Sequence, residues 1–189
     1  MALVTIRPTR ADRAIAEAVA SHTTPELEKT ADLLTWGADE KVLLALSVGA
    51  WLYAAGRPRL RPIADHMLAV SLVSAVLPHL LKRAVDQIRP DRITVKGHWR
   101  GVPWSGRPRD AFPSGHALHM GALASAADLF PPPQRRLARA GAVMLSATRI
   151  LLLAHWTSDV VAGFVAGALI ERLIRTITLG KRRRSGAGK

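Results

Sequence analysis

Three short blocks with charged and polar residues lie between positions 82 and 159 of this 189-residue chain. Residues 82–90 read KRAVDQIRP, residues 113–116 read PSGH, and residues 149–159 read RILLLAHWTSD. PSGH alone would be a weak signal. The three blocks together fix ten positions in order, so a chance match is very improbable. The three blocks are therefore expected to take part in one chemistry.

The cations and the helix start in these blocks suit a bound phosphate. Lys82, Arg89 and Arg149 supply three positive charges, and each arginine can hold phosphate oxygens through two parallel hydrogen bonds. Ser114 is a favourable N-cap, and Gly115 lets an oxyanion approach the backbone. The helix that begins there would add free N–H groups and the positive end of its dipole. A phosphoryl transition state requires such groups, because its charge spreads over the equatorial oxygens.

Two histidines and an aspartate complete a set for covalent catalysis. His155 and Asp159 are four residues apart, so on a helix that starts near His155 both would lie on one face. We expect Asp159 to accept a hydrogen bond from the imidazole N–H, which would fix the tautomer and leave the other nitrogen as a nucleophile. His116 then remains as the general acid.

Five apolar segments carry or flank these blocks: 42–56, 62–81, 114–130, 137–156 and 157–170. Each approaches the roughly 17–25 residues that cross a hydrocarbon layer, and their small residues suit close helix packing in lipid. Five such runs are too many for a soluble helical core of this size. The sequence therefore predicts an all-α fold, an integral-membrane bundle of about five transmembrane helices. The three polar blocks fall at the same predicted ends of those helices.

Composition and charge exclude several other classes. The chain has no cysteine, which excludes disulfide scaffolds, thiol nucleophiles and thiolate zinc sites, and its 5% aromatic content disfavours a β-sandwich. A net charge of +13 fits either a nucleic-acid binder or a membrane protein with basic cytoplasmic loops. The mean hydropathy of +0.12 despite this charge favours the second interpretation, with a bilayer as partner and no nucleic acid.

Charge also predicts the topology. With five crossings, the basic stretches 57–61, 135–139 and 181–184 share one side, which the positive-inside rule makes cytoplasmic. The segment 82–113 then lies on the extracytoplasmic face, although it is strongly basic too. We interpret its charges as serving an anionic ligand. This places the active site outside the cytoplasm of a multi-pass inner-membrane protein whose C-terminus is cytoplasmic.

The chain is expected to divide into three parts. Residues 1–36 form amphipathic helices at the membrane interface, because residues 11–21 and the helix start at Thr24-Pro25 are too polar to span. Residues 37–178 form the transmembrane catalytic domain. Residues 179–189 form a basic cytoplasmic tail that faces anionic lipid.

The blocks together resemble the type 2 phosphatidic acid phosphatase (PAP2) superfamily, which includes vanadium haloperoxidases. The family pattern is K-x6-R-P, P-S-G-H and S-R-x5-H-x3-D, and only Thr148 departs from it. The resemblance implies His155 as phosphoryl acceptor, Asp159 as its orienter and His116 as acid. It assigns phosphate binding to Lys82, Arg89, Ser114, Gly115 and Arg149. It also implies a reaction without metal or other cofactor.

The resulting hypothesis is a lipid phosphatase. Its substrate would be a lipid phosphomonoester or diphosphate, such as a polyprenyl diphosphate, phosphatidate, phosphatidylglycerol phosphate or a lipid A phosphate. One alternative is a vanadate-dependent haloperoxidase using the same pocket, but those relatives are soluble and much longer. The other is a basic membrane-associated binding protein without turnover. A binder needs the cations but has no use for His155 paired with Asp159.

Overall fold

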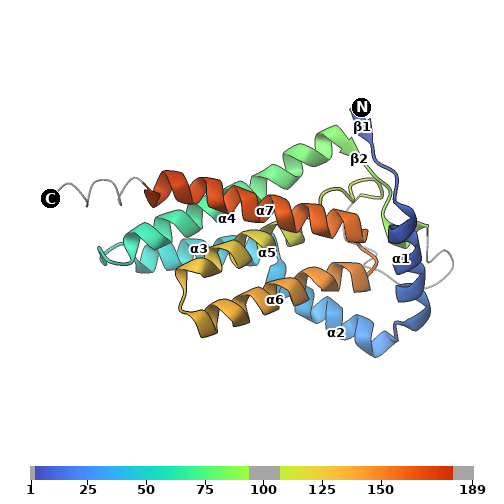
Figure 1. Ribbon diagram of the computed structural model, residues 1–189, viewed down its shortest axis with the longest axis horizontal. Helices are drawn as coiled ribbons and strands as arrows, with labels where there is room; N and C mark the ends of the chain where they lie inside the picture. The colour runs from blue at the N-terminus through green and yellow to red at the C-terminus, as the bar shows by residue number, and fades with distance from the viewer. Residues whose placement is uncertain (1–2, 94–106, 181–189) are drawn as a thin grey trace.

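The computed structural model describes residues 3–93 and 107–180, in which seven α-helices form most of the structure (Figure 1). Five of them make the bundle: α3 (Glu40–Tyr53), α4 (Arg61–Ala84), α5 (Gly115–Ala126), α6 (Pro132–Leu151) and α7 (Thr157–Thr178). The N-terminal helices are α1 (Arg10–His22) and α2 (Pro25–Thr35). Short elements complete the described chain: β1 (Val4–Thr5), β2 (Val85–Asp86) and the 3-10 turns η1 (Trp36–Ala38), η2 (Pro90–Arg92) and η3 (Ala127–Leu129).

The helical class predicted from the apolar segments is confirmed, and each of the five segments overlaps one bundle helix. The boundary of α6 differs from the prediction, because this helix begins at Pro132 and ends at Leu151, before the third polar block is complete. Only α4 is long and apolar enough to cross a membrane by itself among the described helices. Helices α3 and α5 have 14 and 12 residues.

Helices α5 and α7 make the closest contact in the bundle, through glycines. A Cβ on Gly121 would lie 1.9 Å from the carbonyl oxygen of Phe164, and one on Gly167 would lie 1.9 Å from that of Leu118. A Cβ on Gly163 would lie 2.5 Å from the carbonyl oxygen of Ser114. The predicted role of small residues in close helix packing is thus observed here. This contact fixes the start of α5 against the first half of α7.

The N-terminal helices begin where their caps predict. Thr9 forms a capping box with Asp12 at the start of α1, and Thr24 with Pro25 starts α2. Helix α1 lies across one end of the bundle (Figure 1), where Ala16 packs against a hydrophobic cluster formed by Ala111, Leu153 and Trp156. The preceding strand β1 pairs in parallel with β2, which directly follows α4. The prediction of an all-α fold did not include this pairing of two residues from each strand.

A buried polar cluster joins the helices at the other end of the bundle. His66 of α4 hydrogen-bonds through Nε2 to Glu171 Oε1 at 3.0 Å and through Nδ1 to Thr178 Oγ1 at 2.9 Å, both on α7. Arg175 donates to both Glu171 oxygens, at 2.8 and 2.7 Å, and Ser125 of α5 donates to the same carboxylate. Paired in this way, the buried carboxylate is satisfied without water.

Candidate active site

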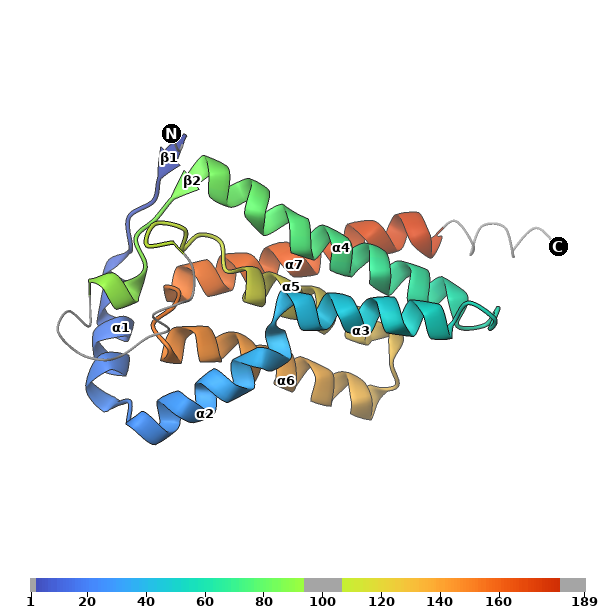
Figure 2. The ribbon, with the colours of Figure 1, turned by 180° about the vertical axis from the view of Figure 1, so that it is seen from behind.

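The residues singled out in the sequence come from different helix ends that meet near α1 (Figure 2). Lys82 lies in the last turn of α4 and Arg89 directly before η2. The second block begins α5, and the third runs from the last turn of α6 through the connection to the first turn of α7. Arg89, Ser114, Arg149, His155 and Asp159 are all buried, with exposed fractions of 4% or less.

Arg89 occupies the centre of this arrangement. Its Nη1 donates to the carbonyl oxygen of Ala154 at 2.7 Å and lies 3.4 Å from His155 Nε2. On the other edge of the guanidinium, Nη2 and Nε donate to Asp110 Oδ1 at 2.8 and 3.0 Å, and Nε also reaches the carbonyl of Arg107 at 3.2 Å. These contacts fix the guanidinium in one orientation beside the imidazole.

The contacts of His155 determine its tautomer. Nδ1 lies 2.6 Å from the carbonyl oxygen of Ala111, which can only accept a hydrogen bond, so Nδ1 carries the proton. Nε2 then keeps its lone pair, and the donor Nη1 of Arg89 faces it. Burial, followed by the positive charges of Arg89, Arg149 and Lys82, lowers the pKa of His155 well below its usual value. The ring is therefore neutral, with a nucleophilic nitrogen turned to the cations.

Asp159 does not make the hydrogen bond that the sequence analysis expected. Its Oδ2 lies 3.8 Å from His155 Nδ1, and the nearer acceptor is the Ala111 carbonyl. The reason is that α7 begins at Thr157, so His155 precedes the helix and the four-residue spacing does not place both side chains on one helical face. Asp159 Oδ2 instead accepts from the backbone N–H of Trp156 at 2.9 Å, at the N-terminus of α7. Its negative charge is still close to the imidazole.

The second block forms the helix start that was expected. Ser114 is the N-cap of α5, and its hydroxyl accepts from the Ala117 N–H at 3.4 Å. Among the described residues, a Cβ on Gly115 would meet only Pro78, at an ordinary 3.5 Å, so packing against them does not require glycine at this position. His116 is the second residue of α5. Its imidazole interacts electrostatically with the positive charges of Arg149, Lys82 and Arg89.

Arg149 brings the third cation from α6. Nη1 donates to Thr35 Oγ1 of α2 at 3.1 Å, whereas Nε is buried and finds no acceptor among the described residues. The neighbouring Thr148, which stands where the family pattern has serine, donates its hydroxyl to the Leu145 carbonyl at 2.6 Å. The hydroxyl at this position thus bonds to the backbone of its own helix. Arg149 Nε is left as a donor for a ligand.

Sequence reasoning missed several groups that shape this site. Asp110 links Arg89 to Lys82, whose Nζ lies 3.8 Å from Asp110 Oδ2. Ala111 contributes a backbone carbonyl, which leaves no signal in the sequence. Asp12 of α1 hydrogen-bonds to Ser158, at the start of α7. Asp110 stands three residues before the PSGH block and was visible in the sequence, but the other two groups depend on contacts across the fold.

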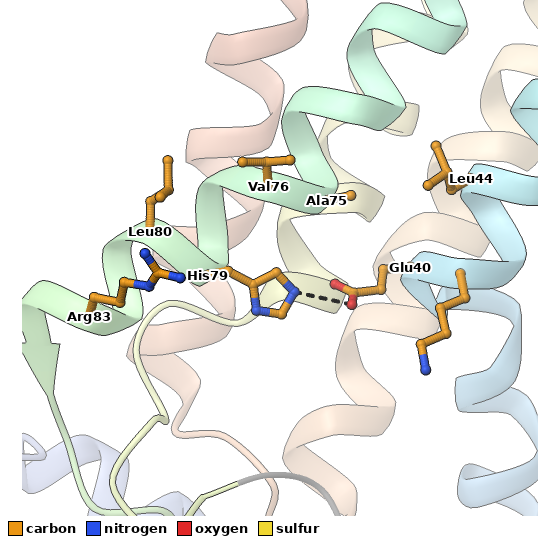
Figure 3. Close-up of a pocket in the computed structure, with 8 residues that line it drawn as sticks. Glu40, Leu44, Ala75, Val76, His79, Leu80 and Arg83 are labelled. Atoms are coloured by element: carbon orange, nitrogen blue, oxygen red, sulfur yellow. Dashed lines mark hydrogen bonds and ion pairs between the residues drawn. The ribbon is translucent and has the colours of Figure 1, made fainter.

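Two hollows open next to the cations. A groove of about 370 Å³ lies between α3 and α4, and Figure 3 shows Leu44, Val76 and Leu80 along it and His79 hydrogen-bonded to Glu40 at 3.2 Å. A second cavity, of about 640 Å³, is lined by residues that include Lys82 and Asp110. His79 and Arg83 line both hollows. The central part of the basic segment 82–113, residues 94–106, lies outside the described residues.

Two solved structures share this fold over most of the chain. Aquifex aeolicus LpxE matches with a TM-score of 0.72 at 19% identity, over 90% of this chain and 98% of that one. The transmembrane PAP2-type phosphatidylglycerolphosphate phosphatase of Bacillus subtilis matches with a TM-score of 0.62 at 22% identity, over 88% and 84%. At these identities the likeness shows a shared fold.

Sequence relatives and a family model extend the likeness to the polar blocks. Proteins named lipid A 1-phosphatase from Rhizobium johnstonii and Rhizobium etli are 37% and 36% identical over 112 residues, 59% of this chain. The match covers 46% and 48% of those proteins, so it spans about half of their length. The family model described as the PAP2 superfamily matches residues 65–183, which contain all three blocks. Because this match covers more than half of the chain, the chain belongs to the PAP2 superfamily.

Proposed function

We propose that this chain is an integral-membrane phosphatase that releases phosphate from a lipid phosphomonoester or diphosphate through a phosphohistidine. The observation that carries the proposal is the state of His155. Its Nδ1–H is held by the Ala111 carbonyl, and its free Nε2 lies 3.4 Å from the Arg89 guanidinium. A nucleophile next to a phosphate-binding cation is the arrangement that phosphoryl transfer requires.

In the first step, His155 Nε2 attacks phosphorus while the bond from phosphorus to the leaving oxygen breaks. Lys82, Arg89 and Arg149 neutralise the equatorial oxygens, and the free N–H groups at the start of α5 add to this. His116 gives a proton to the leaving oxygen. The imidazole becomes cationic as the N–P bond forms, and the nearby carboxylate of Asp159 stabilises this charge.

In the second step, a water molecule attacks the phosphohistidine. His116, now neutral, takes a proton from that water, the N–P bond breaks, and His155 returns to its neutral tautomer. Inorganic phosphate leaves and His116 is protonated for the next cycle. All positive charge at the transferred group comes from side chains of the chain itself, so we propose that no metal takes part.

The lipid part of the proposal rests on the surroundings of the site. The groove between α3 and α4 in Figure 3 is lined by Leu44, Val76 and Leu80, and it suits an acyl or prenyl chain whose phosphate lies at the helix ends. We propose that all five bundle helices cross or enter the bilayer, with α1 and α2 at the interface. The site would face the extracytoplasmic side and the tail, residues 179–189, the cytoplasm; residues 181–189 lie outside the described residues.

The test is phosphate release by the purified protein in neutral detergent. A panel of lipid phosphates and diphosphates is assayed with and without EDTA, and acid-quenched samples are analysed for phosphohistidine. We expect turnover that EDTA leaves intact, inhibition by vanadate, and an acid-labile phosphoenzyme that is absent in His155→Ala. Turnover that disappears with EDTA and returns with Mg²⁺ would contradict the proposal, as would normal turnover in His155→Ala.

A further inference from the structure

We propose that the basic cavity beside Lys82 binds a second phosphate group of the same substrate molecule. This cavity, here called the second-anion site, has four cationic side chains in its lining, Lys82, Arg83, Arg107 and Arg109. Its volume of about 640 Å³ lies within the roughly 300–1,000 Å³ of small-molecule sites. The inference rests on the proposed function and specifies the substrate class.

Two carboxylates line the same cavity, but both are already engaged. Asp110 binds Arg89 at 2.8 Å and lies 3.8 Å from Lys82 Nζ. Asp86 pairs with Arg109 at 3.2 Å. The cavity therefore has more positive than negative charge after its internal ion pairs are formed.

Arg83 and Arg107 are the cations that remain for a ligand. All 14 acidic side chains of the chain lie within the described residues, and none of them forms an ion pair with either arginine. Arg83 is in the last turn of α4, next to Lys82. The backbone of Arg107 is held in place, because its carbonyl accepts from Arg89 Nε at 3.2 Å. Arginines without an acidic partner next to a phosphate site favour a second phosphate over a neutral group.

The second-anion site adjoins the site of the transferred phosphate. Lys82 and Asp110 belong to both, since Asp110 is bound to Arg89 and lines the cavity. A ligand in the cavity is thus next to the reacting group, which is expected of two phosphates on one molecule. Two substrates have this chemistry: a lipid diphosphate, and a glycolipid with monophosphates on two positions.

The experiment compares the double variant Arg83→Gln/Arg107→Gln with wild type and with Arg136→Gln, an exposed arginine at the far end of α6. Phosphate release is measured in neutral detergent, so that the substrate is the only anionic lipid. The substrates are phosphatidate, a polyprenyl diphosphate and a bis-phosphorylated glycolipid. We expect the double variant to lose about tenfold or more in kcat/KM on one doubly phosphorylated substrate, and little on phosphatidate. The substrate that shows the loss identifies the source of the second phosphate.

Equal losses on all three substrates would overturn the inference, since the arginines would then act on the transferred phosphate. No loss on any substrate would overturn it too. Calorimetry compares the binding of inorganic pyrophosphate with that of inorganic phosphate, and this tests the diphosphate alternative without turnover. A pyrophosphate preference that the double variant loses, in a protein without turnover, would refute the phosphatase and keep the second-anion site. Melting temperatures of the three proteins check that the variants fold.

Discussion

The carboxylate of Asp12 accepts two hydrogen bonds from Ser158, one from its backbone N–H and one from its hydroxyl, both at 2.8 Å. Ser158 is in the first turn of α7, where backbone N–H groups lack partners within the helix. The N-terminal helix α1 thus contributes a cap to α7, which begins two residues after His155. Asp12 is only 3% exposed, so these hydrogen bonds are buried and shielded from water.

Replacing Asp12 by alanine is expected to lower the stability by about 1–2 kcal/mol, the cost of losing a helix cap. The Ser158 N–H and hydroxyl would remain buried without an acceptor. Because the cap adjoins the third polar block, kcat is expected to fall while KM changes little. Thermal unfolding and steady-state kinetics measure both effects. Glu17→Ala, an exposed acidic residue of the same helix, is the control.

The same pair predicts a pH dependence of stability. Burial raises the pKa of Asp12, but hydrogen bonds from Ser158 and Thr9 outweigh it and lower the pKa below the usual value. The ionised form is thus favoured in the folded state, and its stabilisation is present above a pH of about 4 and lost as the pH falls further. The stability gap between wild type and Asp12→Ala should therefore narrow on acidification. A gap of constant size from pH 7 to pH 3 would contradict this assignment.

Asp159→Asn is expected to lower turnover substantially and leave the fold intact. The amide oxygen can still accept from the Trp156 N–H, and the Ala111 carbonyl still fixes the imidazole tautomer, so only the negative charge near His155 is lost. That charge stabilises the cationic imidazole of the phosphoenzyme. The burst rate of phosphoenzyme formation measures the effect, and an unchanged burst would show that Asp159 serves only as the α7 cap.

Because the pKa of His155 is lowered, we expect the phosphoenzyme to form at pH values below the usual pKa of histidine. A lowered pKa means that the neutral nucleophile persists to lower pH, so its fraction does not fall at pH 6.5. Burst rates with p-nitrophenyl phosphate, corrected for ionisation of the substrate, should stay level from pH 7 to below pH 6. A decline with a midpoint near 6.5 would show that His155 titrates as an exposed histidine.

The role of His116 is tested by the leaving group. A lipid alkoxide needs a proton as the P–O bond breaks, and general acid catalysis of this kind contributes roughly 10²–10⁴-fold. A nitrophenolate leaves without that proton. His116→Ala should therefore lose most of the burst rate on a lipid phosphomonoester and much less on p-nitrophenyl phosphate, whereas His155→Ala loses both. Equal losses in His116→Ala would show that this residue binds phosphate and is not the acid.

A pair of glycines tests the packing of the two site helices. Gly121→Ala places a methyl 1.9 Å from the Phe164 carbonyl, so α5 and α7 must separate. We expect a loss of several kcal/mol, at the upper end of single substitutions, and no activity. Gly141→Ala in α6 meets nothing within 4 Å and should stabilise its helix by up to about 1 kcal/mol. Equal melting temperatures for the two variants would contradict the close contact.

Local patterns in the sequence predicted the helices and grouped side chains that the structure places close together. Apolar runs and caps such as Thr24-Pro25 are local signals, and the ordered blocks identified Arg89, Arg149 and His155 as neighbours. What failed was the inference from spacing to geometry. His155 precedes α7 by two residues, so the helical spacing to Asp159 did not apply.

The unforeseen parts of the site depend on contacts between distant segments. Asp12 and Ser158 are 146 residues apart, and no periodicity connects them. The Ala111 carbonyl is a backbone atom that every residue type would offer. Hydropathy alone predicts five transmembrane helices, but two of the five bundle helices have fewer residues than a single membrane crossing needs.

The glycine contact between α5 and α7 does not tolerate larger side chains, whereas other parts of the bundle can tolerate substitutions. The starts of α5 and α7 both adjoin the candidate site, and the two helices touch backbone to backbone, so neither can accept a larger side chain at the contact. Helix α3 has no buried residue and forms one wall of the groove in Figure 3. Substitutions there can reshape the fit to a lipid chain and leave the reacting groups in place. We therefore expect a change of lipid specificity to arise through α3, which carries none of the proposed site residues.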